Sequence, residues 1–331
     1  MPDESDSNFY LTDASPKDKP WDSHRALADR VEGLYDLGGF QRYAKRVHEC
    51  SQRLGFILEA QDTGEFLLRL RTARFCRVRL CPVCQWRRSL MWRARFIKAI
   101  PKLYADFPKA RYIFLTLTVK NCEVMELRST LNTMTAAWNR FTKRKQFPAI
   151  GYVRATEVTR NPQTGQAHPH FHVLMMVKST YFKTDCYLSQ QRWRELWQSC
   201  LKVDYLPVVN VKTVKQRLSK VKTLNEGDPI DITDPMIAGI LETVKYSVKP
   251  DDLVADQDWL IELTRQLHRT RGLMLGGVFK NYLSENEPDD LISEDEEKFS
   301  DSDLLMVFDW GHQSKRYKKT GVMEARFLPR Q

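Results

Sequence analysis

Alternating apolar and polar side chains predict several strands in the middle of the chain. Residues 111–119 have the pattern of a buried strand, with apolar side chains at every second position. Residues 151–159 and 168–177 also have strand composition, and a polar loop with proline and glycine joins them into a predicted hairpin. A further short strand is expected at 208–214. These four segments are the candidate sheet.

Apolar residues recur with helical spacing on either side of these strands. The predicted helical segments are 21–45 (broken at Gly38-Gly39), 123–145, 188–201, 233–249 and 256–271. Four antiparallel strands with helices inserted between them predict an α+β fold, with helices on one face of an antiparallel sheet.

The central hairpin gathers three histidines. Alternate residues of a strand share a face, so His168, His170 and His172 project together. If the hairpin closes symmetrically about its polar loop, Glu157 lies opposite His170 on that face. A single strand histidine is usually a surface or core residue, but three of the chain's seven within five positions favour a divalent metal site. Zinc suits such ligands, as does Mg²⁺ or Mn²⁺ where a substrate adds oxygens.

A second predicted hairpin brings cysteines together. An Asp-Thr-Gly turn at 62–64 places Cys50 opposite Cys76, and Cys81 and Cys84 follow with the spacing of a metal knuckle. Four thiolates meet the tetrahedral demand of a structural zinc ion, with His48 as a possible substitute ligand. The Cys-x-x-Cys pair alone is also compatible with a redox site. The fourth cysteine at the open end of the hairpin favours zinc.

Charge points to a polyanionic partner. The net charge is +10, but residues 285–303 hold ten acidic side chains and one lysine; because that segment contributes −9, the rest of the chain carries +19. Cations and two tryptophans surround the cysteines and suggest a phosphate-binding surface, with an ordinary solvated face as the alternative. The members of this set are Arg69, Arg71, Arg74, Arg77, Arg79, Arg87, Arg88, Arg93, Arg95 and Lys98, with Trp86 and Trp92.

Neither a membrane span nor a signal peptide is evident, so a cytoplasmic protein with reduced cysteines is expected.

The segment 233–249 carries a set of polar side chains on one side of its predicted helix. Glu242, Tyr246 and Lys249 fall at i, i+4 and i+7, away from the apolar stripe. A tyrosine used only for packing belongs on that stripe. The alternative for Glu242 is a surface ion pair with a nearby lysine.

Together these motifs resemble those of the rolling-circle replication initiators of small bacterial plasmids, within the HUH endonuclease superfamily. Residues 114–119 resemble the first family motif, His168-Pro-His-Phe-His172 the second, and the set at 242, 246 and 249 the third. Residues 77–84 resemble a cysteine-containing segment of one branch. The resemblance covers about 48–283.

The resemblance implies a nicking reaction on single-stranded origin DNA. Tyr246 would attack a phosphodiester, giving a 5′-phosphotyrosyl link and a free 3′-OH that primes synthesis. Lys249 would stabilise the phosphate's charge, and Glu242 would activate water for a final hydrolytic release.

For the metal, the resemblance assigns His170, His172 and Glu157 as ligands of Mn²⁺ or Mg²⁺. His168 is a fourth ligand or a supporting group. Host helicase and polymerase are the further partners implied, and the oligomeric state is left open.

The expected organisation has six parts. They are an N-terminal extension, partly disordered (1–47), a basic zinc module (48–100), the nicking domain (105–255), a helical extension (256–283), an acidic disordered linker (284–303) and a basic tail (304–331). Two other functions remain open: a non-catalytic zinc-containing DNA-binding regulator, and an HUH transposase or relaxase. Trp310, beside the tail's basic patch, is expected either to anchor it or to stack.

Overall fold

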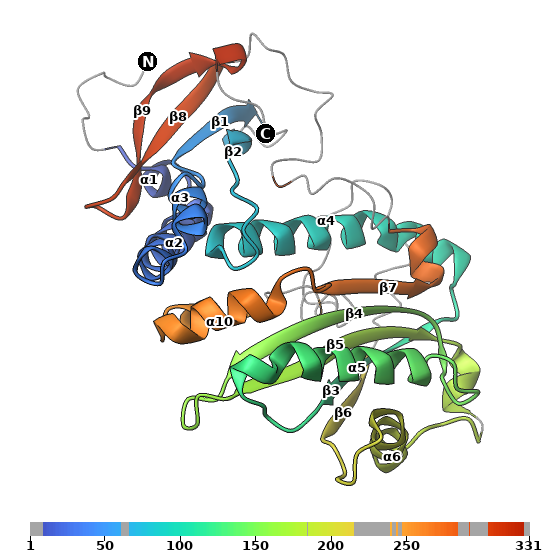
Figure 1. Cartoon of the computed structure of the whole chain (residues 1–331). Coiled ribbons are helices and arrows are strands. Elements are labelled where there is room, and N and C mark those ends of the chain that lie inside the picture. Colours follow the sequence, from blue (N-terminus) through green and yellow to red (C-terminus); the bar gives the residue numbers. More distant parts are fainter. Residues whose placement is uncertain are drawn as a thin grey trace. The chain divides into compact units, whose positions relative to one another are not determined.

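The computed structural model divides the chain into two compact units (Figure 1). Unit 1 comprises 1–88, 253–261 and 288–331, and unit 2 comprises 89–252 and 262–287. The residues that the structure describes are 9–60, 66–183, 185–214, 239, 243, 247–283, 291 and 304–327.

Unit 2 is built on a five-stranded antiparallel sheet of order β6-β3-β5-β4-β7. The strands are β3 (Arg111–Thr118), β4 (Ala149–Arg160), β5 (Ala167–Val177), β6 (Val209–Val214) and β7 (Leu273–Gly277). The four strands expected from the sequence are present, which confirms the α+β antiparallel prediction. The fifth, β7, was not predicted.

Strand β7 escaped prediction because glycines occupy it. A Cβ built on Gly276 would lie 2.1 Å from the Tyr152 ring of β4, so only glycine allows this close pairing. Gly277 has φ of +58° and an equally close approach to the Ile150 carbonyl. Glycines are typical of loops, but here they allow β7 to pair with β4.

Both faces of this sheet are covered in part. Helices α5 (Leu127–Phe141) and α6 (Gln190–Leu201) lie on one face, where Phe171 and Trp197 have ring centroids 6.4 Å apart. The later turns of α4 (Pro82–Asp106) pack with Leu174 and Met176, which are on the opposite face. That second face is also the one that carries the even-numbered histidines of β5. Short helical turns complete the unit at Val124–Glu126, Ser179–Phe182 and Val278–Asn281.

Unit 1 holds a four-stranded antiparallel sheet assembled from both ends of the chain. Its order is β2-β1-β8-β9, so the hairpin of β1 (Arg53–Ala60) and β2 (Phe66–Ala73) pairs with that of β8 (Leu304–Gly311) and β9 (Arg316–Glu324). Figure 1 shows β1 and β8 side by side, although about 250 residues separate them in the sequence. The pairing of Ile57 with Arg69 has the predicted register, while the turn expected at 62–64 lies outside the described residues.

The first predicted helical segment is present in unit 1, whereas α4 was not predicted. The segment 21–45 forms α2 (Lys19–Leu37) and α3 (Gln41–His48), separated at the two glycines. The other described helices and short turns are α1 (Leu11–Ala14), α9 (Pro250–Leu253), α10 (Gln257–Leu267), Pro16–Asp18 and Ala325–Phe327.

Three expectations about organisation need correction. Residues 304–324 form two strands rather than a tail, because their alternating apolar side chains, such as Leu305 and Val307, are buried. The N-terminal extension, expected to be partly disordered, contains α1, α2 and most of α3 among its described residues. The boundary expected near residue 100 falls inside α4, whose first turns belong to unit 1 and the rest to unit 2. Except for Leu291, the expected acidic linker lies outside the described residues.

Candidate metal sites

The predicted histidine–glutamate cluster forms at one end of the unit 2 sheet. Strand register pairs Glu157 of β4 with His170 of β5, as the loop symmetry predicted. The Glu157 Oε2 atom lies 2.7 Å from His172 Nε2 and 3.2 Å from His170 Nε2. All three residues are buried, with 5–8% of their surface exposed.

Electrostatics favour a charged carboxylate in this cluster. Burial alone would raise the pKa of Glu157, but hydrogen bonds from His170 and His172 outweigh it and hold that pKa well below its ordinary value. The His172 ring stacks on Phe114 at 5.4 Å, and its Nδ1 lies 3.4 Å from the Thr116 hydroxyl, which fixes the direction of Nε2.

The three side chains fit a divalent cation. One ligand atom from each lies within 4.8 Å of the others. Adjacent ligands of an octahedral ion at about 2.1 Å are about 3 Å apart, close to the two distances from Glu157 Oε2. Two imidazoles and a carboxylate are compatible with Mn²⁺, Mg²⁺ or Zn²⁺ and leave positions for substrate oxygens.

His168 does not share this arrangement. Its Nδ1 lies 2.8 Å from Asn121 Oδ1, and its ring centroid is 5.2 Å from that of His170. Burial and the nearby His170 lower the pKa of His168. The sequence analysis did not predict a role for Asn121. Its position just after β3 could have indicated one, because β3 pairs with β5, the strand that carries His168.

The candidate nucleophile and its acidic neighbour lie outside the described residues, so the structure gives no position for Tyr246 or Glu242. Residues on either side are described. An added Cβ on Gly239 would lie 3.5 Å from Leu174, which shares the histidine face. The Val158 N–H, next to Glu157, donates to the Ser247 carbonyl at 2.9 Å. Lys249 is exposed.

The four cysteines of unit 1 converge as predicted. Cys50 follows α3, Cys76 follows β2, and Cys81 and Cys84 flank the start of α4. All are buried, and three of the Sγ–Sγ distances are 3.6 Å (Cys50–Cys84), 3.6 Å (Cys76–Cys84) and 3.7 Å (Cys50–Cys81).

These distances match a tetrahedral zinc site. With Zn–S bonds of about 2.3 Å, the edge of a regular tetrahedron is about 3.8 Å. Disulfide-bonded sulfurs would be about 2 Å apart. Two backbone N–H groups also point at the sulfurs, from Cys76 to Cys50 Sγ at 3.5 Å and from Val78 to Cys76 Sγ at 3.4 Å. His48, the possible substitute, pairs instead with Glu32.

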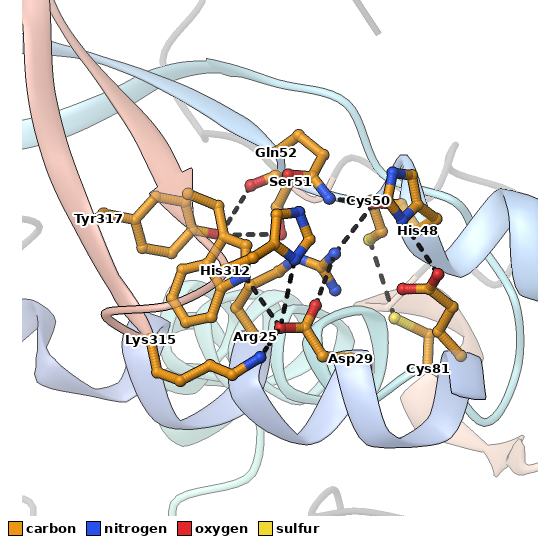
Figure 2. A network of polar contacts seen from close by, with 12 residues as sticks. Arg25, Asp29, His48, Cys50, Ser51, Gln52, Cys81, His312, Lys315 and Tyr317 are labelled. Carbon is orange, nitrogen blue, oxygen red and sulfur yellow. Dashed lines mark hydrogen bonds and ion pairs between the residues drawn. The ribbon is translucent and has the colours of Figure 1, made fainter. Parts of the chain in front are cut away.

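The C-terminal hairpin fastens the cysteine site to α2 (Figure 2). The hydroxyl of Tyr317 donates to the Ser51 carbonyl at 2.7 Å, one residue after Cys50. Asp29 of α2 accepts hydrogen bonds from Lys315 at 2.6 Å and from the Trp310 indole at 3.0 Å. Trp310 is therefore an anchor in this structure, and residues that were predicted to form a tail contact the backbone next to the cysteine cluster.

The predicted DNA-binding arginines have different surroundings. Arg74 pairs with Glu49 at 2.7 Å, and Arg87 lies over the Trp21 and Trp86 rings and donates to the Leu291 carbonyl. Of the others, Arg77 is exposed, and Arg79, Arg88, Arg93 and Arg95 are half-buried. Burial lowers the pKa of Arg79 to about 10. Arg93 and Arg95 belong to unit 2 and the rest to unit 1.

No helix in the described part of the chain is long and apolar enough to cross a membrane.

A family model described as "Replication protein" matches residues 67–318. The chain is 34% identical to "Protein rep" of Streptococcus pneumoniae serotype 2 over 91% of this chain and 92% of the relative. It is 38% identical to "Protein rep" of Lactiplantibacillus plantarum (87% and 88%), and 33% identical to "Replication protein" of Staphylococcus aureus (66% and 95%). No solved structure matches the chain.

Proposed function

The chain belongs to this replication protein family, that of plasmid rolling-circle replication initiators, and from this premise we propose that it nicks single-stranded DNA at a plasmid origin. Tyr246 is the proposed nucleophile. Glu157, His170 and His172 hold the proposed divalent cation, and the four cysteines hold a structural zinc ion. The products are a 5′-phosphotyrosyl link and a free 3′-OH.

The main support for the proposal is a backbone hydrogen bond between the residue after the candidate nucleophile and the residue after a candidate metal ligand. Ser247, covalently joined to Tyr246, accepts a hydrogen bond from Val158, the residue after Glu157. Val248 pairs with Val158 as well, and Asp252 accepts from the Arg160 N–H at 3.0 Å. The chain after Tyr246 is thus fastened to β4 at three positions near Glu157.

The proposed reaction exchanges one phosphorus–oxygen bond for another. The Tyr246 oxygen forms a bond to phosphorus as it loses its proton, and the bond from phosphorus to the 3′ oxygen breaks, with that oxygen taking a proton. A tyrosine hydroxyl ordinarily has a pKa near 10, so the attack requires activation. When bound, the cation supplies Lewis-acid polarisation of the phosphate. His170 and His172 present Nε2 from a rigid sheet, and Lys249 is proposed to offset charge on the phosphate.

The direct test is covalent capture. The full chain is incubated with a single-stranded oligonucleotide from its plasmid's origin and Mn²⁺, and the products are run on a denaturing gel. We expect a slower protein–DNA band and a shortened strand with a free 3′-OH, both absent when the divalent cation is omitted. A chain that binds this DNA without forming the band is a non-catalytic regulator, which would end the proposal.

The cluster makes a graded prediction. His170→Ala or Glu157→Ala removes a proposed cation ligand from a buried site, so nicking should fall by about 100-fold or more while binding to the oligonucleotide changes little. His168→Ala serves as the matched control, because its ring bonds to Asn121 outside the cluster, and its loss should be under tenfold. Initial rates of nicking check this. Equal losses for all three variants would contradict the assignment.

Glu242 is proposed to activate the water that ends a replication round. Glu242→Gln should leave the first cleavage intact but slow hydrolytic release, so the covalent band persists about 100-fold longer in a chase with unlabelled oligonucleotide. A wild-type rate of release would assign Glu242 to a surface ion pair instead.

A further inference from the structure

A short helix of unit 1 presents a basic side that the nicking reaction does not use. α2 ends at Leu37, and α3 begins at Gln41 after a three-residue turn in which Gly39 has φ of +75°. This order of helix, glycine-containing turn and short second helix is that of a helix-turn-helix element. The α3 helix has eight residues, Gln41–His48.

Aromatic packing fixes which side of α3 faces outward. The Tyr35 ring of α2 lies 6.1 Å from that of Phe40 in the turn and 5.4 Å from that of Tyr43, and Phe40 and Tyr43 are 5.7 Å apart. Ala44 and Val47 of α3 are buried on the same side. The helix therefore cannot rotate about its axis without breaking this cluster.

The opposite side of α3 consists of hydrogen-bond donors and cations. Gln41, Arg42, Lys45 and Arg46 are all exposed, and at 100° per residue they span an arc of about 140°. No acidic residue occurs between residues 37 and 48. Two nearby carboxylates are engaged, since Glu32 pairs with His48 at 3.0 Å and Glu49 with Arg74 at 2.7 Å, while Asp36, before the turn, is exposed.

The cysteine site holds the far end of this helix. The His48 carbonyl accepts hydrogen bonds from Arg25 at 2.9 Å and Gln52 at 2.5 Å (Figure 2), and Cys50 follows two residues later. Arg46 donates to the Cys76 carbonyl at 2.5 Å, which places α3 beside the loop that carries exposed Arg77. A bound structural zinc would make this placement rigid.

We propose that α3 enters the major groove of double-stranded DNA, an inference that rests on the proposed function in taking plasmid DNA as the partner. The major groove is wide enough for an α-helix, and arginine and glutamine pair with guanine and adenine edges there. The first turn of such a helix contacts the bases. Gln41 and Arg42 occupy that turn, and Lys45, one turn later, contacts the phosphate backbone.

The test measures duplex binding without any nicking. Full-length, zinc-loaded protein is titrated against a fluorescent 30-base-pair DNA duplex from the origin region, with no Mg²⁺ or Mn²⁺ present. Arg42→Ala/Lys45→Ala should weaken binding about tenfold or more and make the slope of log affinity against log salt shallower by about 1 to 2. Lys17→Ala/Lys19→Ala, which removes the same charge from exposed positions at the start of α2, should change the affinity less than twofold.

Circular dichroism and zinc content are measured first to check that both double variants are folded, which is expected because the substituted residues are exposed. An equal loss of duplex affinity in the two double variants, or no loss in Arg42→Ala/Lys45→Ala, would overturn the proposal. A duplex RNA of the same sequence should compete poorly, because its deep, narrow major groove excludes a helix; equal competition would also overturn it. These outcomes are separate from the proposed nicking, since the covalent band is measured on single strands with metal.

Discussion

Tyr246→Phe should abolish the covalent protein–DNA band and reduce nicking by at least about 1,000-fold, while binding to the origin oligonucleotide stays within about twofold of wild type. The substitution removes one oxygen, the atom proposed to bond to phosphorus, and leaves the ring in place. Because the covalent step has no other nucleophile in the proposal, its loss should be nearly complete rather than graded. The measurement is the denaturing-gel assay with Mn²⁺, with DNA binding followed in parallel.

The matched control for this substitution is Tyr187→Phe. Tyr187 is 57% exposed and contacts the rings of Tyr181 and Phe182, so removing its hydroxyl keeps those contacts. The covalent band should form at the wild-type rate in this variant. A band that survives in Tyr246→Phe would assign the nucleophile to another residue and refute the proposed mechanism, whatever happens in the control.

The histidine–glutamate cluster could be predicted from sequence because a hairpin with a short polar loop has few possible registers. One symmetric closure placed Glu157 opposite His170, and the structure has that pair. The same reasoning brought Cys50 to Cys76 across the first hairpin. In the β1–β2 and β4–β5 hairpins the candidate ligands are close in sequence, so local rules of alternation and turn geometry were sufficient.

Pairings between distant segments could not be predicted in the same way. The β1–β8 pairing joins the two ends of the chain, and nothing local to residues 304–311 indicates which strand they meet. Basic side chains at 315–319 suggested a tail, whereas Tyr317 is fully buried, with its hydroxyl on Ser51. α4 was not predicted, because it begins within the cysteine knuckle and contains Pro101, a residue that usually ends or bends a helix.

The proposed zinc ligands give the second large prediction, since their cluster lies next to the end of α3, the end of β2 and the start of α4, and Tyr317 of β9 is bonded to Ser51 beside it. Cys81→Ser should lower bound zinc from one per chain to none and lower the melting temperature of unit 1 by more than about 10 °C. A structural zinc contributes apparent binding free energies of about 10–16 kcal/mol, which is as large as the whole stability of a typical domain. Removing one of four thiolates leaves three buried sulfurs without the ion that balances their charge.

The exposed Cys186 provides the control, because Cys186→Ser changes the same atom outside the cluster and should keep both zinc and melting temperature. Elemental analysis and a thermal scan followed by tryptophan fluorescence make the comparison. Because Cys50 lies two residues beyond α3, loss of zinc in Cys81→Ser should weaken duplex binding as well, by at least as much as Arg42→Ala/Lys45→Ala does. If Cys81→Ser retains one zinc per chain and melts with the wild type, the four cysteines are a packed thiol cluster and α3 takes its position from the aromatic contacts alone.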